Sequence, residues 1–392
     1  MIFKKIDPSI LFKVNTKSNS YENIDCIIYS NNFYRTKNYL ANLKNCIVYN
    51  EYPFINAFAV NIFPNNISLL SSINHINYIT SQAKVFTQVN VAKKIMDLSC
   101  FANNNINGKD ITIAFIDTGI NPHLDFVYPK NRILFFKDFI NNKPKPYDDN
   151  GHGTFVASVA AGNGICSCKK YSGVAPSCNI ISLKALDNNG ETGAFTILEA
   201  MQWVYDNHKQ YNIKVVCMSF GSQPLKQSDP LLKGAEALWN EGITVVAAAG
   251  NSGPSQSTIK SPGISPKIIT VGALNDNRDE NGIVDENKFE VAQFSSRGPA
   301  FNYYKPDLIT SGVNLVCCSS KANEFYTKMS GTSVSTPLIA GLSALIVQKF
   351  PTIKPIEVKS ILLTNCKKLT GDRNLEGFGY FTSDSIKKLL NY

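Results

Sequence analysis

The sequence predicts a large α/β domain with a mainly parallel sheet, preceded by a small ferredoxin-like α+β domain. Short apolar runs separated by helical stretches follow residue 100, whereas the segment before residue 87 has the order β-α-β-β-α-β. The chain has 392 residues, of which 44% are hydrophobic. This is enough for one domain of about 250–300 residues and a smaller one. We therefore expect two domains, residues 1–87 and 88–392.

The small domain is predicted from short runs of β-forming residues. Alternation of apolar and polar residues is typical of a half-buried strand, and "INAFAVNIF" shows it most clearly. The expected strands are 26–29, 46–52, 55–63 and 76–80, and the expected helices are 31–43 and 65–73. Residues 81–90 are polar and lack a strong periodicity, which favours a linker.

The large domain is predicted from apolar runs of strand length, which are typical of strands buried on both faces of a parallel sheet. A helical stretch such as 192–211 separates neighbouring runs, as crossover connections require. The polar residues of interest stand at the C-terminal ends of the runs, where ligand crevices form in open α/β sheets. The five runs are 111–117, 179–186, 213–220, 243–251 and 267–274.

Charge and cysteine content argue against several function classes. The net charge of +9 is spread along the chain without a run of five Lys or Arg residues, so we expect no nucleic-acid partner. No window of about 18 apolar residues predicts a membrane helix, and residues 1–20 lack the apolar stretch of a signal peptide. The ten cysteines have no zinc-ligand spacing. We expect reduced thiols in a cytoplasmic protein, with disulfide pairing as the alternative.

Asp117 and His152 are the first candidates for chemistry. Asp117 ends the apolar run of "AFIDTG", and His152 stands between two glycines at the start of a helix of small residues in "DDNGHGTFVASVAAG". A lone histidine is more often structural, but the glycines and the aspartate favour a catalytic one here. The other three histidines have less suitable surroundings: His75 lies in the small domain, His123 follows a proline, and His208 ends a helix.

Ser333 and Asn251 are the candidates for nucleophile and oxyanion donor. Ser333 precedes an apolar helix that we expect Pro337 to break at its start, and the unpaired amides of a helix N-terminus stabilise negative charge. The alternative is an ordinary N-cap serine. Asn251 follows a strand of small residues in "AAGN", where its amide can donate to an oxyanion or simply form a turn.

Taken together, the motifs "IDTG", "NGHGT", "AAGN" and "SGTSVSTP", in this order, resemble the subtilisin family of serine proteases over about residues 90–380. The resemblance implies a three-layer subtilisin-like fold, a catalytic triad of Asp117, His152 and Ser333, and an oxyanion hole that Asn251 completes. We therefore expect a serine endopeptidase that acts on proteins or peptides. The alternative is a catalytically silent subtilase-fold protein that binds or regulates.

Two other hydrolase classes do not match. An aspartic protease would need a second DTG or DSG motif, which the chain lacks. A serine esterase would be expected to carry G-x-S-x-G, and "GTSVS" lacks the second glycine.

The resemblance also implies that the substrate lies as an extended strand between two strand edges of the enzyme, residues 219–221 and residues 193–195. Lys260 would stand at the base of the pocket for the residue before the cut, where relatives usually have a small residue. There it would favour an acidic or small side chain, unless its amine extends to solvent. The implied substrate-binding residues are Ser219, Phe220, Gly221, Gly193, Ala194, Phe195, Ala249, Gly250 and Lys260.

The small domain resembles the inhibitor-chaperone propeptide of the same family, which the enzyme itself removes. The resemblance implies a self-processing zymogen whose propeptide inhibits it, with cleavage next to Thr87, among Phe86, Thr87 and Gln88. A propeptide without a signal peptide resembles intracellular bacterial members of the family. It also resembles germination-associated proteases of spore-forming bacteria, so a spore-associated location is the alternative.

We expect no cofactor and no metal. Asp125 matches one ligand of the calcium site in secreted relatives, but one carboxylate is not a calcium cage. The stretch 161–177 lacks the longer loop that wraps calcium in those relatives. Calcium dependence stays open on the sequence, as does the oligomeric state.

Overall fold

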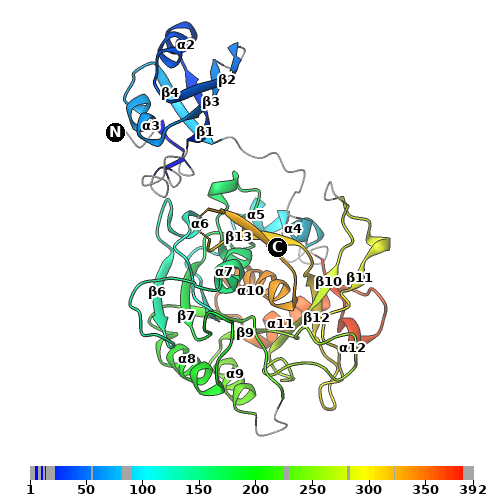
Figure 1. The fold of residues 1–392 in the computed structure, drawn as a ribbon. Helices are drawn as coiled ribbons and strands as arrows, with labels where there is room; N and C mark the ends of the chain where they lie inside the picture. Colours follow the sequence, from blue (N-terminus) through cyan, green and yellow to red (C-terminus); the bar gives the residue numbers. More distant parts are fainter. Residues whose placement is uncertain are drawn as a thin grey trace. The chain divides into compact units, whose positions relative to one another are not determined.

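The computed structural model describes residues 5–7, 10–11, 14, 23–53, 56–81, 91–96, 98–224, 229–279, 283–321 and 323–382. The chain divides into two compact units, an N-terminal unit (Met1–Phe86) and a main unit (Thr87–Tyr392) (Figure 1).

The N-terminal unit has the predicted β-α-β-β-α-β order. Its antiparallel sheet has the strand order β2-β3-β1-β4, which is ferredoxin-like. In β1 and β3, buried residues largely alternate with less buried ones, and they pack with buried residues of the two helices into a separate core. The elements are β1 (Ile24–Ser30), α2 (Phe33–Ala41), β2 (Cys46–Tyr52), β3 (Ala57–Ile62), α3 (Pro64–Ser71) and β4 (Ile76–Ser81).

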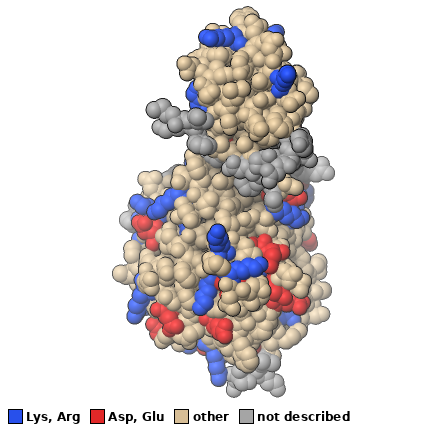
Figure 2. All heavy atoms as spheres, turned by 60° about the vertical axis from the view of Figure 1, so that its left-hand side comes forward, with Lys and Arg blue, Asp and Glu red and all other residues tan. Residues whose placement is uncertain are grey.

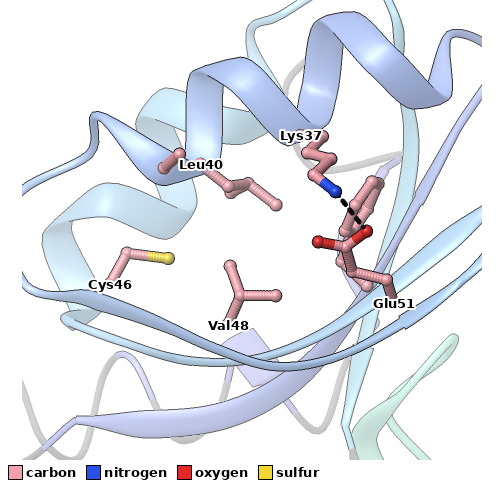
Figure 3. A pocket seen from close by; sticks show the side chains of 7 residues that line it. Lys37, Leu40, Cys46, Val48 and Glu51 are labelled. Atoms are coloured by element: carbon pink, nitrogen blue, oxygen red, sulfur yellow. Dashed lines mark hydrogen bonds and ion pairs between the residues drawn. The ribbon is translucent and has the colours of Figure 1, made fainter.

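A pocket of about 260 Å³ lies between α2 and β2 of the N-terminal unit (Figure 3). Leu40, Cys46 and Val48 line its apolar part, and an ion pair of 2.9 Å between Lys37 Nζ and Glu51 Oε2 borders it. All residues predicted for catalysis belong to the main unit, so this pocket is not part of the candidate active site.

The main unit is built on one large sheet, with the strand order β15-β16-β12-β10-β9-β8-β5-β7-β6. The strands from β12 to β6 are parallel, whereas β15 pairs antiparallel with β16 and β11 pairs antiparallel with β10. All five predicted strands are present; β6 and the short strands beyond β10 were not predicted. The strands are β5 (Thr112–Asp117), β6 (Ile133–Asp138), β7 (Asn179–Lys184), β8 (Ile213–Met218), β9 (Thr244–Ala248), β10 (Ile269–Asn275), β11 (Glu290–Val291), β12 (Leu308–Ser311), β15 (Cys366–Lys367) and β16 (Tyr380–Phe381).

Helices cover both faces of this sheet and complete a three-layer α/β fold. The helices α7 (His152–Ala161) and α10 (Thr332–Lys349) pack together on one face, and α8 (Ala194–Asn207) and α9 (Pro230–Asn240) pack together on the other (Figure 1). Other elements are α4 (Val91–Ile95), α5 (Ser99–Asn103), α6 (Leu124–Val127), η3 (Ile165–Ser167), η5 (Glu286–Lys288), the hairpin β13 (Leu315–Cys318) and β14 (Tyr326–Met329), α11 (Pro355–Thr364) and α12 (Arg373–Glu376).

The close packing of α7 on α10 depends on Gly341. A Cβ atom at this position would lie 3.0 Å from the carbonyl oxygen of Ala160 and 2.7 Å from Cβ of Val174. The absent side chain lets the two helices approach, and each of them carries a residue predicted for catalysis in its first turn, His152 in α7 and Ser333 in α10.

Basic and acidic side chains are interspersed on the face of the main unit drawn in Figure 2. Among the described residues, no helix combines the length and the apolar character needed to span a membrane.

Candidate active site

The predicted site residues follow strands whose C-terminal ends share one edge of the sheet. Asp117 is the last residue of β5, Ser219 directly follows β8, and Asn251 comes three residues after β9. These strands are neighbours in the order β9-β8-β5 and run parallel. Because adjacent strands lie about 4.8 Å apart, the ends of β5 and β9 are separated by about 10 Å. That span suits a cleft between the aspartate side and the asparagine side.

The Asp117 carboxylate holds the His152 ring. Oδ1 of Asp117 lies 2.7 Å from Nδ1 of His152 and accepts a second hydrogen bond of 2.7 Å from the Thr118 N–H. The carboxylate is buried, with Asp117 only 2% exposed, whereas the His152 side chain is 25% exposed. With Nδ1 occupied by the carboxylate, Nε2 is the ring nitrogen left for a second partner.

The charge of Asp117 also sets the protonation of His152. Burial alone would lower the pKa of His152, because it disfavours the charged imidazolium. The negative charge and hydrogen bond of Asp117, with a smaller contribution from the charge of Asp148, outweigh burial and raise the pKa above its usual value of 6.5.

Asp148 lies in the same motif as His152, "DDNGHGTFVASVAAG", but no local pattern predicts a role for it. Its Oδ1 accepts from Thr118 Oγ1 at 2.9 Å and from the Gly151 N–H at 2.8 Å. Its Oδ2 accepts from the N–H and the Oγ1 of Thr154, at 2.8 and 2.6 Å. Asp148 thus fixes the start of α7 against the end of β5, and we class it as a positioning residue for His152.

Thr332 orients the Asn251 amide. The N–H and the Oγ1 of Thr332 donate to Oδ1 of Asn251, at 2.9 and 3.0 Å. This use of the carbonyl oxygen leaves the Nδ2 amine of Asn251 as the group that can donate to a substrate. Thr332 is a positioning residue that local sequence signals do not reveal, since its partner lies 81 positions away.

Ser333 and Asn251 border the same space beside Gly331. A Cβ atom at Gly331 would lie 3.0 Å from Ser333 Oγ and 3.3 Å from Asn251 Nδ2. Gly331 has a φ of 152°, which a residue with a side chain rarely adopts. The glycine therefore supplies both the turn into α10 and the room between the two polar groups.

The structure differs from the prediction at Pro337, because α10 continues through this residue instead of breaking. Pro337 lacks an N–H, so the carbonyl of Ser333, four residues earlier, has no helical donor. The Oγ and the N–H of Ser333 make no hydrogen bond to another residue in the described part of the chain. The contact between Ser333 and His152 that the triad requires is therefore not formed as a hydrogen bond in this structure.

The segment after β8 has the free edge expected for substrate binding. Among the described residues, none forms a hydrogen bond with the backbone of Ser219, Phe220 or Gly221. The following residue, Ser222, pairs with Ser261 through backbone bonds of 2.9 and 3.0 Å. A peptide strand can therefore add to Ser219–Gly221 without displacing existing bonds.

The second predicted edge is wrong in part. Gly193 is extended, with φ −80° and ψ 155°, and forms the N-cap of α8. Ala194 and Phe195 lie in the first turn of that helix rather than in a strand. The N-cap Gly193 has no side chain that could form a capping hydrogen bond. The sequence therefore lacks the capping side chain that usually marks the start of a helix. The Phe195 ring is 84% exposed and is free to contact a ligand from the helix start.

The residues expected on the opposite side of the substrate strand are Ala249, Gly250 and Lys260. The N–H of Lys260 donates to the carbonyl of Ala249 at 2.9 Å, and the N–H of Gly250 donates to Thr332 Oγ1 at 3.1 Å. These bonds tie the loop after β9 both to the segment of Lys260 and to the start of α10. Of the remaining predicted site residues, Phe86, Thr87 and Gln88 lie outside the described residues.

The residues around Asp125 do not fit a calcium cage. Oδ1 of Asp125 accepts from the Cys166 N–H at 3.0 Å, and Oδ2 accepts from Tyr326 Oη at 2.8 Å. Among the described His, Cys, Asp and Glu side chains, those of His123 and Cys318 place a ligand atom within 4.8 Å of the carboxylate. Calcium takes six to eight oxygen ligands, which a nitrogen, a sulfur and one carboxylate do not supply. Hydrogen bonds within the cluster already use the carboxylate, and we assign no metal to it.

Comparison with known proteins identifies relatives of this chain. The subtilase family matches residues 108–380. Serine protease AprX of Bacillus subtilis (strain 168) is 38% identical over 363 residues, covering 84% of this chain and 79% of that protein. M-protease of Shouchella clausii (strain KSM-K16) is 29% identical over 342 residues, covering 86% of this chain and 81% of that protein.

Solved structures give the same result. S41 psychrophilic protease superimposes with a TM-score of 0.63 at 29% identity, covering 76% of this chain and 99% of that chain. Sphericase superimposes with the same TM-score and identity, covering 77% and 99%. The segment matched by the family contains all four residues predicted for catalysis, Asp117, His152, Asn251 and Ser333.

Proposed function

Because this chain belongs to the subtilase family of serine endopeptidases, we propose that it hydrolyses peptide bonds with Asp117, His152 and Ser333 as its catalytic triad. The observation that carries the proposal is the 2.7 Å contact between Asp117 and the His152 ring at the sheet edge that also bears Asn251. Ser333, bordering the same space as Asn251, supplies the hydroxyl that such a histidine activates.

The first step is attack of Ser333 Oγ on the carbonyl carbon of the scissile bond. His152 Nε2 accepts the hydroxyl proton as the new bond forms and then donates it to the leaving amine. Asp117 keeps the Nδ1–H tautomer and stabilises the imidazolium that forms between these events. Water then attacks the acyl-enzyme in the same way, with His152 again accepting the proton, and Ser333 is released from the acyl group. The hydrogen bond between Ser333 and His152 forms when substrate is bound, as is common for catalytic bonds that are long in free enzymes.

The tetrahedral oxyanion is held by two donors. Asn251 Nδ2 is one, since Thr332 occupies the carbonyl oxygen of the same amide. The Ser333 N–H is the other, since it lies in the first turn of α10, where backbone amides lack helical partners and the helix dipole favours negative charge. Both donors are fixed before the reaction, so little reorganisation accompanies charge development.

The oxyanion donors give a first prediction. Asn251→Ala is expected to lower kcat by about 10²–10³, with little change in KM, because the lost bond forms only in the transition state. Gly331→Ala is expected to lower kcat at least as much, because its Cβ enters the space between Ser333 Oγ and Asn251 Nδ2. Steady-state kinetics on a peptide amide measure both, with Asn240→Ala on α9 as the control. A change confined to KM would contradict this role.

The pKa of His152 gives a second prediction. His152 must be neutral to accept the Ser333 proton, and its raised pKa keeps it protonated up to a higher pH than an ordinary histidine. We therefore expect kcat/KM to fall as pH decreases. The logarithm of kcat/KM should fall with unit slope, and the midpoint of this acidic limb should lie above pH 6.5. A profile of kcat/KM between pH 5 and 9 measures the limb. A midpoint at or below 6.5 contradicts the balance of charges described for His152.

The N-terminal unit is proposed to be a propeptide that inhibits the main unit until the enzyme cuts the chain next to Thr87. The unit has its own core and its own sheet. On the sheet, Ile47 and Tyr49 of β2 are exposed, which leaves apolar side chains for a partner surface to cover. Activity on an added peptide should rise as the full-length chain disappears. Full activity of the uncut chain would contradict inhibition.

A further inference from the structure

Lys260 lies between the two backbone segments that border the proposed substrate cleft. Its N–H donates to Ala249 in the loop after β9, and the next residue, Ser261, pairs with Ser222 in the segment after β8. The loop after β9 leads to Asn251, the proposed oxyanion donor. Lys260 is therefore attached to both sides of the cleft, beside the position of the scissile carbonyl.

The Lys260 side chain occupies space that two glycines leave free. A Cβ atom at Gly221 would lie 2.5 Å from Cβ and 3.2 Å from Cγ of Lys260. A Cβ atom at Gly250 would lie 2.5 Å from Cγ of Lys260. The aliphatic stem thus passes between one glycine of each segment. It shortens the space available there and carries a positive charge at its end.

The ammonium group of Lys260 is not paired within the described part of the chain. Lys260 is half-buried, yet its Nζ forms no hydrogen bond or ion pair with a described residue. The fully buried lysines differ, because Lys184 contacts Asp149 at 2.7 Å and Lys305 contacts Asp307 at 2.6 Å. A cation partly withdrawn from water gains by pairing with a carboxylate. At this place the described residues supply none, and a substrate can.

We propose that Lys260 makes this enzyme prefer an acidic residue immediately before the scissile bond. The inference rests on the proposed function, since it uses the oxyanion site to locate the substrate. The residue before the cut supplies the carbonyl that Asn251 holds, so its side chain enters the cleft beside Gly250. A glutamate or aspartate there meets the Lys260 ammonium, whereas a large aromatic side chain meets the lysine stem.

The test is a set of peptide amides that differ only in the residue before the cut, with Glu, Gln, Lys or Phe at that position. For the wild type, kcat/KM is expected to be about 10- to 100-fold higher for Glu than for Gln, the range of a hydrogen bond to a charged group. Added salt should reduce this ratio without affecting the Gln peptide. A ratio near one overturns the inference, because it places the ammonium in solvent.

Two substitutions assign the preference to Lys260. Lys260→Met keeps the length of the stem and removes the charge, so the ratio of Glu to Gln should fall by about 10- to 100-fold. Lys260→Glu should shift the preference toward the Lys peptide. The matched control is Lys267→Met, which removes an exposed lysine that lies 3.6 Å from Glu236 and should leave the ratio unchanged. A wild-type ratio that survives Lys260→Met overturns the inference.

Failure of the proposed function has a different result. An enzyme that cleaves the Gln or Phe peptide as fast as the Glu peptide retains the proposed function and lacks the acidic preference. An enzyme whose Ser333 does not react with a fluorophosphonate and that cleaves none of the peptides lacks the proposed function itself, and the preference fails with it.

Discussion

Replacement of Ser333 by alanine is expected to lower kcat by about 10⁶, the magnitude known for loss of the serine in subtilisin. The hydroxyl is the nucleophile, and without it His152 has no proton to accept and Asp117 has no imidazolium to stabilise. Alanine fits the site because Ser333 Oγ makes no hydrogen bond to another described residue, so the fold should be retained. Initial rates on a peptide amide, corrected for a host-protease blank, measure the loss.

The neighbouring hydroxyl provides a matched control for this loss. Ser330 precedes Gly331 and accepts a hydrogen bond of 2.8 Å from the Asn314 N–H, outside the proposed triad. Ser330→Ala should change kcat far less than Ser333→Ala, and thermal unfolding should show that both variants fold. If Ser333→Ala keeps more than about 1% of the activity, the assignment of the nucleophile is wrong.

Replacement of Asp117 by asparagine is expected to lower kcat by about 10⁴ at neutral pH, as in other serine proteases with this triad. Oδ1 of Asp117 accepts from both the Thr118 N–H and the His152 ring, and an asparagine can donate its amide to Nδ1 instead. The imidazole then has the wrong tautomer, with its proton on Nε2, where it cannot accept from Ser333.

A shift in the pH profile distinguishes this effect from misfolding. Removal of the Asp117 charge removes the main influence that raises the pKa of His152. The acidic limb of kcat/KM should therefore move to lower pH in Asp117→Asn, while the maximum rate falls. Asp206→Asn, an exposed carboxylate on α8 that accepts from Gln202, should alter neither quantity. An unshifted limb in Asp117→Asn would show that this carboxylate does not set the protonation of His152.

Local sequence patterns were sufficient for the central strands and for the small unit. The run of β5 is buried at every position, so its continuous apolar character marks a strand inside a parallel sheet. The edge strand β6 was not predicted, because buried and exposed residues are mixed along it and the run resembles neither a buried strand nor a regular alternation. The start of α8 was placed incorrectly because Gly193 caps it without a side-chain bond.

The motifs located the candidate site, but not the residues that hold it in place. Asp117 and Asn251 could be recognised because each ends or follows an apolar run at the same edge of the sheet. Thr332 and Asp148 could not be assigned roles in this way. Their bonds to Asn251 and Thr118 join segments 81 and 30 positions apart, and they exist only once α7 and α10 are packed on the sheet.

The most direct test of the central claim is the intact mass of the purified full-length chain beside Ser333→Ala, after identical expression and incubation. A self-processing serine endopeptidase predicts that the wild type splits near Thr87 into its two units while Ser333→Ala stays whole. If both chains split alike, a host protease makes the cut and self-processing is contradicted. If both stay whole and the wild type cleaves no peptide, the catalytically silent alternative is correct.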